Sequence, residues 1–479
     1  VLLVSYHCLR IRREPTSALL WIFLTWSFPL IGATLFLCFG LYRLSDKGWE
    51  KQRADQQLLK ATKTLERDGT TGLITYWKNL RERPVSPPAH ETVHEIDRAL
   101  DGISPEFPLM GGNRVKLLVT GDETYPAMLE AINAAEHHIH LQSFIISPDS
   151  VGKHFLETLA RKAESGVTVR ILFDRFGSTH AVWKGLFRHY RNTPNLHLQG
   201  WTQANFIKRE FQINLRNHRK TMVVDGHTAF LGGINLSKEN RTENIREPDQ
   251  DYHFMINGPV VHEIQYSFLR DWHFMTGDDP DILLDKNHFP TIDPCGASAA
   301  RLLTSGPTQT EMEAVADTFF SAVSAAEHNL VAVTPYFVPT LDILQAFRSA
   351  ALRGVDVQLV LPEKNNHVYT GLASRSLYDE LLHAGVKIYE RKPPFMHAKA
   401  MLVDDAVAIV GTANLDVRSL KLNYETNLVI YDPQFVYDMR QACNFEIQNS
   451  QQIDPQAWAA RPIHHRLLEN FFALFTPIL

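Results

Sequence analysis

Cysteine is scarce in this chain, with four residues among 479. Cys8, Cys38, Cys295 and Cys443 are too few and too widely spaced for a disulfide framework or a thiolate metal site. A surplus of basic residues is also missing, because the formal net charge is −5. The chain therefore lacks the overall positive field that attracts nucleic acid, and we expect no nucleic-acid partner.

Charged residues are absent from one segment near the N-terminus. Residues 17–42 read SALLWIFLTWSFPLIGATLFLCFGLY. A bilayer core needs about 20 apolar residues in a helix, and no small-residue cleavage site follows, as a signal peptide would require. We therefore predict a transmembrane helix over 17–42. Basic residues flank it on both sides, three before and four after, so the positive-inside rule leaves its orientation open.

The rest of the chain carries an internal repeat. The stretches 131–146 and 155–174 correspond to 322–338 and 344–362, and each pair contains a helix end, an apolar strand, an amphipathic helix and a second strand. Strands that alternate with helices indicate α/β units. We predict two duplicated α/β domains over 108–290 and 291–479, each a mixed sheet flanked by helices, related by a pseudo-two-fold axis.

Two segments precede these domains. Residues 1–43 are predicted to be a membrane anchor, in which VLLVSYHCL resembles the end of an earlier apolar span. Residues 44–107 are predicted to be a connector with a short helical piece, because charged helix-forming sequence gives way there to the Pro-rich RPVSPPAHE.

One motif occurs at the same place in both copies, as NHRKTMVVDGHTAFLGGIN and MHAKAMLVDDAVAIVGTAN. Identical offsets inside a repeat indicate positions that are constrained together. The first copy contains His218, Lys220, Asp225, Gly232 and Asn235, and the second His397, Lys399, Asp404, Gly411 and Asn414.

Strand periodicity separates the members of this motif. HRKTMVV and HAKAMLV are predicted strands, in which side chains alternate between faces. The His and Lys of each motif then share one face, whereas Asp225 and Asp404 point to the other. We expect each aspartate to orient and neutralise local groups rather than to attack a substrate. The glycines permit close approach of the backbone.

Two His–Lys pairs suit displacement at a phosphodiester. That reaction needs a nucleophile, an acid for the leaving alkoxide, and positive charge near the phosphoryl oxygens. Each half supplies only one histidine, so the halves must meet face to face. Histidine serves both roles because its pKa lies near working pH, and we expect neither a metal nor a cofactor.

With these motifs the chain resembles the phospholipase D superfamily, whose signature is a duplicated His-x-Lys-x4-Asp motif, and within it the bacterial cardiolipin synthases. The likeness covers nearly the whole chain and includes FPLIGATLFLCFG, GDETYPAMLEAI, RNHRKTMVVDG, TPYFVP, ALRGVDV and GTANLDVRSLKLNYE. It implies two phospholipase D-like domains after an N-terminal membrane helix, in the bacterial inner membrane, with the catalytic domains on the cytoplasmic side.

The resemblance also implies a reaction. One histidine attacks the phosphorus of phosphatidylglycerol and the other protonates the departing glycerol. A hydroxyl of a second phosphatidylglycerol then attacks the phosphohistidine and gives cardiolipin. His218 is the expected nucleophile and His397 the expected acid, an order that the near symmetry of the motifs leaves open.

Further site residues follow from the same resemblance. The reacting set comprises both motif triplets: His218, Lys220, Asp225, His397, Lys399 and Asp404. The phosphate is held by Lys220, Lys399, Asn235 and Asn414. The family also places a carboxylate behind each histidine, which is Glu425 in the second copy and Asp251 in the first, where Asp249 replaces the family's tryptophan.

Three other segments have two interpretations each. The basic run 208–220 is either a rim that guides anionic headgroups or a solvated face. Arg418 and Ser419 either brace the site or serve packing. The C-terminal RLLENFFALFTPIL contacts a bilayer or docks on its own domain, and docking is favoured. His137, His138 and His140 are not predicted to bind metal, because they lie in or beside a strand of the repeat where the second copy has His328, Asn329 and Val331.

Three functions compete. The first is a cardiolipin synthase, with phosphatidylglycerol or phosphatidylethanolamine as co-substrate. The second is a hydrolase that shares the same intermediate: a phospholipase D, or a nuclease, against which the anchor and the weak basicity count. The third is an inactive scaffold, which predicts erosion of at least one motif, whereas both are intact. The acyl preference and oligomeric state stay open.

Overall fold

The computed structural model describes residues 1–10, 15–37, 44–67, 81, 85, 87–201, 216–242, 248–306, 308 and 311–476. Its contacts divide the chain into two units, Val1–Glu50 and Lys51–Leu479. Each unit is described by itself.

The first unit contains α1 (Leu2–Arg10), α2 (Pro15–Ser27), α3 (Pro29–Leu35) and the start of α4 (Leu44–Arg67). The prediction of one continuous helix from residue 17 is wrong, because α2 ends at Ser27 and Phe28 leaves the helical conformation, with φ −134° and ψ 75°. Pro29 explains the break: its ring crowds the carbonyl four residues earlier, and it has no N–H to donate. No helix among the described residues is both long and apolar enough to cross a bilayer; positions 38–42 of the predicted helix lie outside them.

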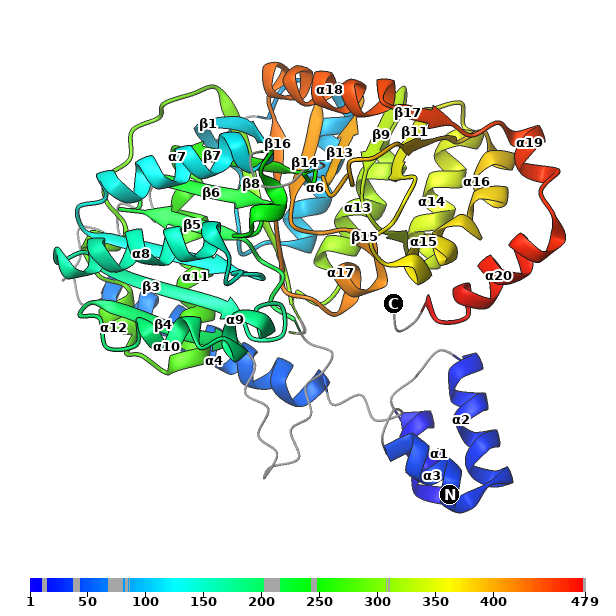
Figure 1. The fold of residues 1–479 in the computed structure, drawn as a ribbon, viewed down its shortest axis with the longest axis horizontal. Helices are drawn as coiled ribbons and strands as arrows, with labels where there is room; N and C mark the ends of the chain where they lie inside the picture. The colour runs from blue at the N-terminus through cyan, green and yellow to red at the C-terminus, as the bar shows by residue number, and fades with distance from the viewer. Residues whose placement is uncertain are drawn as a thin grey trace. The chain divides into compact units, whose positions relative to one another are not determined.

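One mixed sheet of 15 strands runs through the second unit (Figure 1). The first half contributes β1 (Met110–Val119), β2 (His138–Ser143), β3 (Thr168–Asp174), β4 (Leu196–Trp201), β5 (Thr221–Val224), β6 (Thr228–Gly232) and β7 (Tyr252–Asn257). The second half contributes β8 (Ser298–Ser305), β9 (Asn329–Val333), β11 (Asp356–Pro362), β12 (Lys387–Arg391), β13 (Ala400–Val403), β14 (Val407–Gly411), β16 (Glu425–Tyr431) and β17 (Ser450–Gln452).

The strand order confirms the duplication. It is β17-β12-β11-β9-β13-β14-β16-β8-β1-β7-β6-β5-β2-β3-β4, so that the two halves repeat one order outward from the central antiparallel pair of β1 and β8. Within each half the inner strands pair antiparallel and the strands beyond them parallel, as for β2 with β3 and β9 with β11, except that the edge strand β17 pairs antiparallel with β12. The two halves therefore share a single sheet.

Helices cover both faces of this sheet. The longer helices after α4 are α6 (Glu91–Ile103), α7 (Thr120–Ala134), α8 (Ser150–Glu164), α11 (Val261–Thr276), α13 (Ala314–Ala325), α14 (Leu341–Leu352), α15 (Val368–Arg375), α16 (Tyr378–Ala384), α18 (Pro433–Gln448) and α20 (Ile463–Ala473). The short elements are α9 (Thr179–Trp183), α10 (Leu186–His189), η2 (Lys238–Asn240), α12 (Pro280–Leu283), η3 (Lys286–His288), the paired strands β10 (Phe337–Val338) and β15 (Leu415–Asp416), α17 (Val417–Lys421) and α19 (Pro455–Ala459).

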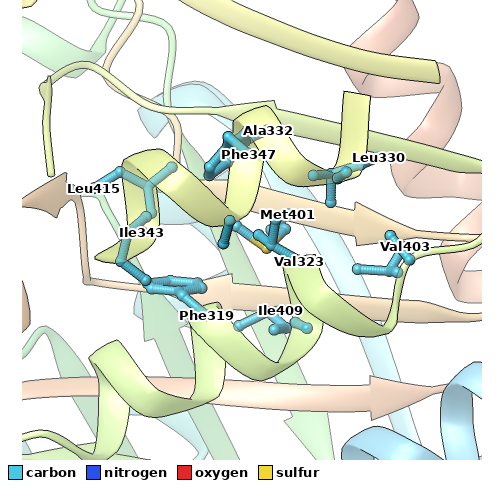
Figure 2. Packing of buried hydrophobic residues seen from close by; sticks show 14 of the residues in the cluster. Phe319, Val323, Leu330, Ala332, Ile343, Phe347, Met401, Val403, Ile409 and Leu415 are labelled. Atoms are coloured by element: carbon cyan, nitrogen blue, oxygen red, sulfur yellow. The ribbon is translucent and has the colours of Figure 1, made fainter. Parts of the chain in front are cut away.

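Three apolar clusters form the core. One lies under α7 and α8 in the first half, and another lies under α13 and α14 in the second half. Figure 2 shows the second of these, where Phe319 and Val323 of α13 and Phe347 of α14 face Met401 of β13. The third joins strands of both halves with α11 and α18. Because both halves contribute to this central cluster, they hold the two motif strands in one fixed relation.

Candidate active site

Each motif histidine lies just before a motif strand, in a segment that pairs with the other half. The amide of His218 donates to the carbonyl of Tyr424 (2.9 Å), and the amide of His397 donates to the carbonyl of Gln250 (2.6 Å). β5 and β13 begin after the lysines, at Thr221 and Ala400, so the predicted strands are shorter than expected at their starts. The extended residues before them are free to bridge the halves.

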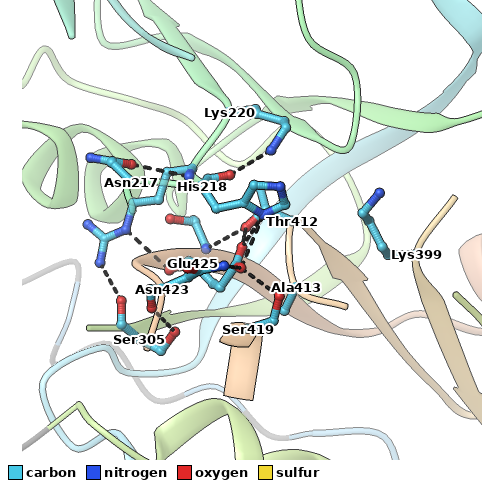
Figure 3. A network of polar contacts seen from close by, with 12 residues as sticks. Asn217, His218, Lys220, Ser305, Lys399, Thr412, Ala413, Ser419, Asn423 and Glu425 are labelled. Carbon is cyan, nitrogen blue, oxygen red and sulfur yellow. Dashed lines mark hydrogen bonds and ion pairs between the residues drawn. The ribbon is translucent and has the colours of Figure 1, made fainter. Parts of the chain in front are cut away.

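This bridging places Glu425 behind His218. Nδ1 of the imidazole lies 2.9 Å and 3.1 Å from the two carboxylate oxygens (Figure 3). Glu425 is fully buried and accepts hydrogen bonds from the Thr412 hydroxyl (2.6 Å), the Ser419 hydroxyl (2.8 Å) and the Asn423 amide (3.2 Å). Ser419 therefore braces the site, which decides between the two interpretations of that residue.

His397 has the equivalent partner from the first half. Its Nδ1 lies 2.6 Å from Oδ2 of Asp251, which is fully buried and also accepts from the amide of Tyr252 (2.8 Å). The two carboxylates cross between the copies: Glu425 of the second copy contacts His218, and Asp251 of the first contacts His397.

Burial and the neighbouring charges set the protonation of these groups. Burial lowers the pKa of His218 against the opposing effect of Glu425. Burial and the Lys399 ammonium lower the pKa of His397 to about 4. The pKa of Glu425 stays below its ordinary value, because His218 outweighs the effect of burial. Each imidazole is therefore neutral at neutral pH, and a proton donated from Nδ1 to the carboxylate leaves Nε2 as the free base.

The two lysines are buried beside the histidines and are not among the residues that line the cleft. Nζ of Lys220 donates to the carbonyl of His218 (2.7 Å), and Nζ of Lys399 donates to that of His397 and lies 3.9 Å from Asp251. Burial lowers the pKa of Lys220 to about 7 and also lowers that of Lys399, and the charge of Lys399 contributes to the shift of Lys220. A bound phosphate dianion or diester would relieve this repulsion and favour both ammonium forms.

The motif aspartates point away from the histidines, as their strand phase predicts. Asp225 accepts from the amides of Glu136 (2.7 Å), His137 (2.8 Å) and His138 (2.8 Å). Asp404 accepts from the amides of Glu327, His328 and Asn329 at 2.7–2.9 Å, and from the Thr92 hydroxyl (2.7 Å). Neither lines the cleft. Their contacts order the backbone that leads into β2 and β9.

Both motif asparagines line the cleft beside the histidines. Oδ1 of Asn235 accepts from the amide of Ile145 (3.1 Å). Asn414 is 4% exposed, and its Oδ1 has no hydrogen-bond partner among the described residues. Gly411 brings its strand close to β16, since a Cβ there would lie 2.4 Å from the carbonyl oxygen of Thr426.

The cleft itself has a volume of about 850 Å³ and is walled by both halves and by the C-terminal segment. Phe144, Phe176, Tyr336 and Asp416 were not assigned to the site from the sequence, because they lie outside the repeated motif. The walls include Phe144, Phe176, Arg216, Tyr336, Asp416, Arg418, Phe471, Phe472 and Phe475. Asp249 lines it too, and burial and Glu239 raise the pKa of its carboxyl to about 7.

Two further sequence features are placed by the structure. Within the basic run 208–220, residues 208–215 lie outside the described residues; Arg216 stacks on Phe176, 3.9 Å from the ring centroid. His138 and His140 are buried beside His288, and burial lowers the pKa of both well below the ordinary value. Among the described residues no group of side chains forms a metal site.

Comparison with known proteins gives one consistent family. The family described as "Cardiolipin synthase, PLD-like domain" matches residues 128–272 and 319–445. A cardiolipin synthase of Alkalihalophilus pseudofirmus is 33% identical over 98% of this chain and 90% of its own length. Cardiolipin synthase 1 of Bacillus cereus is 32% identical with the same coverage. The crystal structure of a Haemophilus influenzae phosphatidylserine synthase shares the fold, with a TM-score of 0.61 and 15% identity over 80% of this chain and all of that one.

Proposed function

The chain belongs to the cardiolipin synthase family with phospholipase D-like domains, and we propose that it transfers a phosphatidyl group from one phosphatidylglycerol to another, which gives cardiolipin and glycerol. One observation carries the proposal: two histidines, each hydrogen-bonded to a buried carboxylate of the opposite half, line one cleft together with the two asparagines that stand at equal offsets in the motifs, and a buried lysine donates to the backbone carbonyl of each histidine. The family supplies the substrate class, and the geometry supplies the roles.

In the first step, Nε2 of His218 attacks phosphorus and the bond from phosphorus to the glycerol oxygen breaks. Glu425 accepts a hydrogen bond from Nδ1 and stabilises the positive charge that the imidazole gains. The leaving glycerol oxygen takes a proton from Nε2 of His397. The anionic phosphate raises the pKa of His397 from its value in the empty cleft, and this lets His397 carry that proton.

In the second step, the reaction reverses with a new alcohol. His397, now neutral, accepts the proton of a glycerol hydroxyl on the second phosphatidylglycerol, and the hydroxyl oxygen attacks the phosphohistidine. The bond from phosphorus to Nε2 breaks and His218 is restored. Lys220, Lys399, Asn235 and Asn414 would stabilise the equatorial oxygens in both steps.

The choice between a lipid alcohol and water depends on water exclusion. The cleft carries aromatic side chains on several sides, among them Phe144, Tyr336 and Phe471. These walls favour a lipid acceptor over bulk water, which supports a transferase rather than a hydrolase.

Membrane association is part of the same proposal. The first unit exposes many large apolar side chains, including Leu2, Leu3, Leu19, Leu20, Phe23, Trp26, Leu30 and Ile31. Exposed apolar surface of this kind indicates contact with a membrane or a partner, and the substrates are bilayer lipids. We therefore place the enzyme at the bacterial plasma membrane.

The test uses purified full-length protein in mixed micelles with phosphatidylglycerol as the only phospholipid, and mass spectrometry of the products. Cardiolipin with equimolar glycerol, absent from the His218→Ala variant, is the expected result. Phosphatidic acid as the main product would make the enzyme a hydrolase. If cardiolipin forms only after phosphatidylethanolamine is added, phosphatidylethanolamine is the second substrate.

A further inference from the structure

The C-terminal helix α20 has two different faces. It packs against α15, beside which it lies in Figure 1. On this inner side, Glu469 is buried and accepts a hydrogen bond from Arg461 (2.7 Å), which stacks on Trp458; Trp458 in turn stacks on Tyr378 of α16. The preference for docking on its own domain is therefore confirmed, but docking accounts for only one face.

The end of the same helix enters the catalytic cleft. Phe471, Phe472 and Phe475 line the cleft that contains His218 and His397. An element far from the motifs in sequence thus supplies apolar wall to the site where phosphoryl transfer takes place.

The outer face of α20 and of the turn after it is apolar and exposed. Leu467 is 62% exposed and Leu474 is 75% exposed, and Ile463 and Leu468 are also exposed. Val368 and Tyr369, at the start of α15, extend this surface. Across the cleft, Phe176 of the first half is exposed as well and stacks on Arg216. Apolar side chains therefore border the cleft mouth on both halves.

We propose that α20 docks the mouth of the cleft on a lipid bilayer, so that a phospholipid moves into the cleft with its acyl chains against the phenylalanines of this helix. The proposal depends on the proposed function for the identity of the lipid. The exposed leucines and the cleft-lining phenylalanines belong to one continuous surface, along which acyl chains avoid water while the phosphate reaches the histidines.

Charge supports a bilayer of anionic lipid as the occupant. The first turns of α20 carry His464, His465 and Arg466, whereas Glu469 is neutralised by Arg461. The Arg466 charge next to an apolar helix face suits the headgroup level of a membrane that contains phosphatidylglycerol. A second copy of the chain on the same surface would obstruct the mouth instead.

The first test measures insertion directly in the full-length protein. Leu474→Cys carries an environment-sensitive fluorophore, in a background with Cys38 and Cys295 replaced by serine. Vesicles of phosphatidylglycerol and phosphatidylcholine should shift its emission to the blue, and doxyl-labelled phosphatidylcholine should quench it. Leu352→Cys is the matched control, because Leu352 is also a leucine at 68% exposure but lies at the end of α14; its label should stay unquenched.

The second test measures turnover. Leu467, Leu468 and Leu474, none of which lines the cleft, are changed together to glutamine. The rate on vesicles should fall on the order of tenfold or more, since three apolar side chains no longer enter the bilayer. The rate on short-chain phosphatidylglycerol, dissolved as monomers, should stay unchanged, as should both rates of the Leu352→Gln control.

Several outcomes would overturn the inference. An unquenched label at position 474 in active enzyme would exclude bilayer contact. An equal loss of both rates would mean that the leucines only support the fold. A blue shift that needs high protein concentration and no vesicles would identify a second copy as the occupant. Quenching in an enzyme that makes no cardiolipin would instead reject the proposed function and retain the docking surface.

Discussion

At the scale of single residues, the chemistry depends on pairs that cross between the halves. His218 relies on Glu425, and His397 relies on Asp251. Neither half alone contains both a histidine and the carboxylate that contacts it. An isolated half would therefore lack the second histidine, and nothing would fix the tautomer of the histidine that it has. The crossing explains why a duplicated sequence acts as one site.

Replacement of either histidine by alanine should reduce cardiolipin formation on the order of 10³-fold. The two variants should differ on a phosphatidyl ester of 4-nitrophenol, whose departing oxygen needs no proton. His397→Ala should release nitrophenol in a burst and retain a covalent lipid adduct, whereas His218→Ala should do neither. Absorbance measures the nitrophenol that is released, and the mass of the intact protein shows whether it carries the covalent lipid adduct.

The controls are the same two variants on phosphatidylglycerol and the unchanged enzyme on both substrates. A burst from His218→Ala and none from His397→Ala would exchange the two roles. Substantial turnover of phosphatidylglycerol by either variant would contradict a site shared between the halves.

At the scale of elements, the motif aspartates connect each motif turn to the neighbouring strand. Asp225 and Asp404 have positive φ, 50° and 51°, and their carboxylates accept the amides that precede β2 and β9. The left-handed conformation is tolerated by aspartate and asparagine because a short polar side chain bonds locally. These residues therefore belong to the scaffold that aims the strands.

Asp404→Asn should lower the free energy of unfolding by about 2–3 kcal/mol, because a neutral amide replaces a carboxylate that accepts four hydrogen bonds. The pKa of Asp404 lies below its ordinary 3.8, since these bonds outweigh burial. Its contribution is therefore present above about pH 4 and is lost as pH falls through the lowered pKa. Urea unfolding at pH 7 and pH 3 should show a difference that shrinks at the lower pH.

The matched control is Asp405→Asn. Asp405 has the same φ of 51° but an exposed carboxylate paired with Arg440 (2.6 Å). Its loss should cost no more than about 1 kcal/mol. A fully stable but inactive Asp404→Asn variant would instead give that aspartate a chemical role.

At the scale of the whole molecule, buried charges tie remote segments to the central helix α11. Arg270 lies 2.6 Å from Asp55 of α4, 3.1 Å from Glu106 before β1 and 3.1 Å from Glu311 of the second half. One guanidinium thus neutralises carboxylates from three parts of the chain. Together with the shared sheet, this makes the second unit one cooperative body.

Arg270→Ala should lower the free energy of unfolding by about 3–5 kcal/mol, because it leaves buried carboxylates without their cation. Denaturant unfolding followed by circular dichroism should show one transition for both halves, displaced to lower denaturant. Arg348→Ala, which removes a half-exposed pair with Glu380 (2.9 Å), should change stability by less than about 1 kcal/mol. Two separate transitions in the unchanged protein would contradict cooperative unfolding.

The sequence by itself determined whatever depends on local periodicity and on the repeat. Equal offsets from His218 and His397 predicted two halves that meet at one site, strand phase predicted that Asp225 and Asp404 turn away, and alternating elements predicted two duplicated α/β domains. These features follow from geometry within a few residues, which the order of residues encodes directly.

Only the tertiary structure decided which distant segments meet. The crossed carboxylates, the joining of both halves in one sheet, and the entry of α20 into the cleft depend on packing between residues far apart in the chain, and no local pattern distinguishes one partner from another. The break before Pro29 has a local cause inside the long apolar run. Proline has no N–H to donate and its ring crowds the carbonyl four residues earlier, so it interrupts the helix whatever the surroundings of the chain.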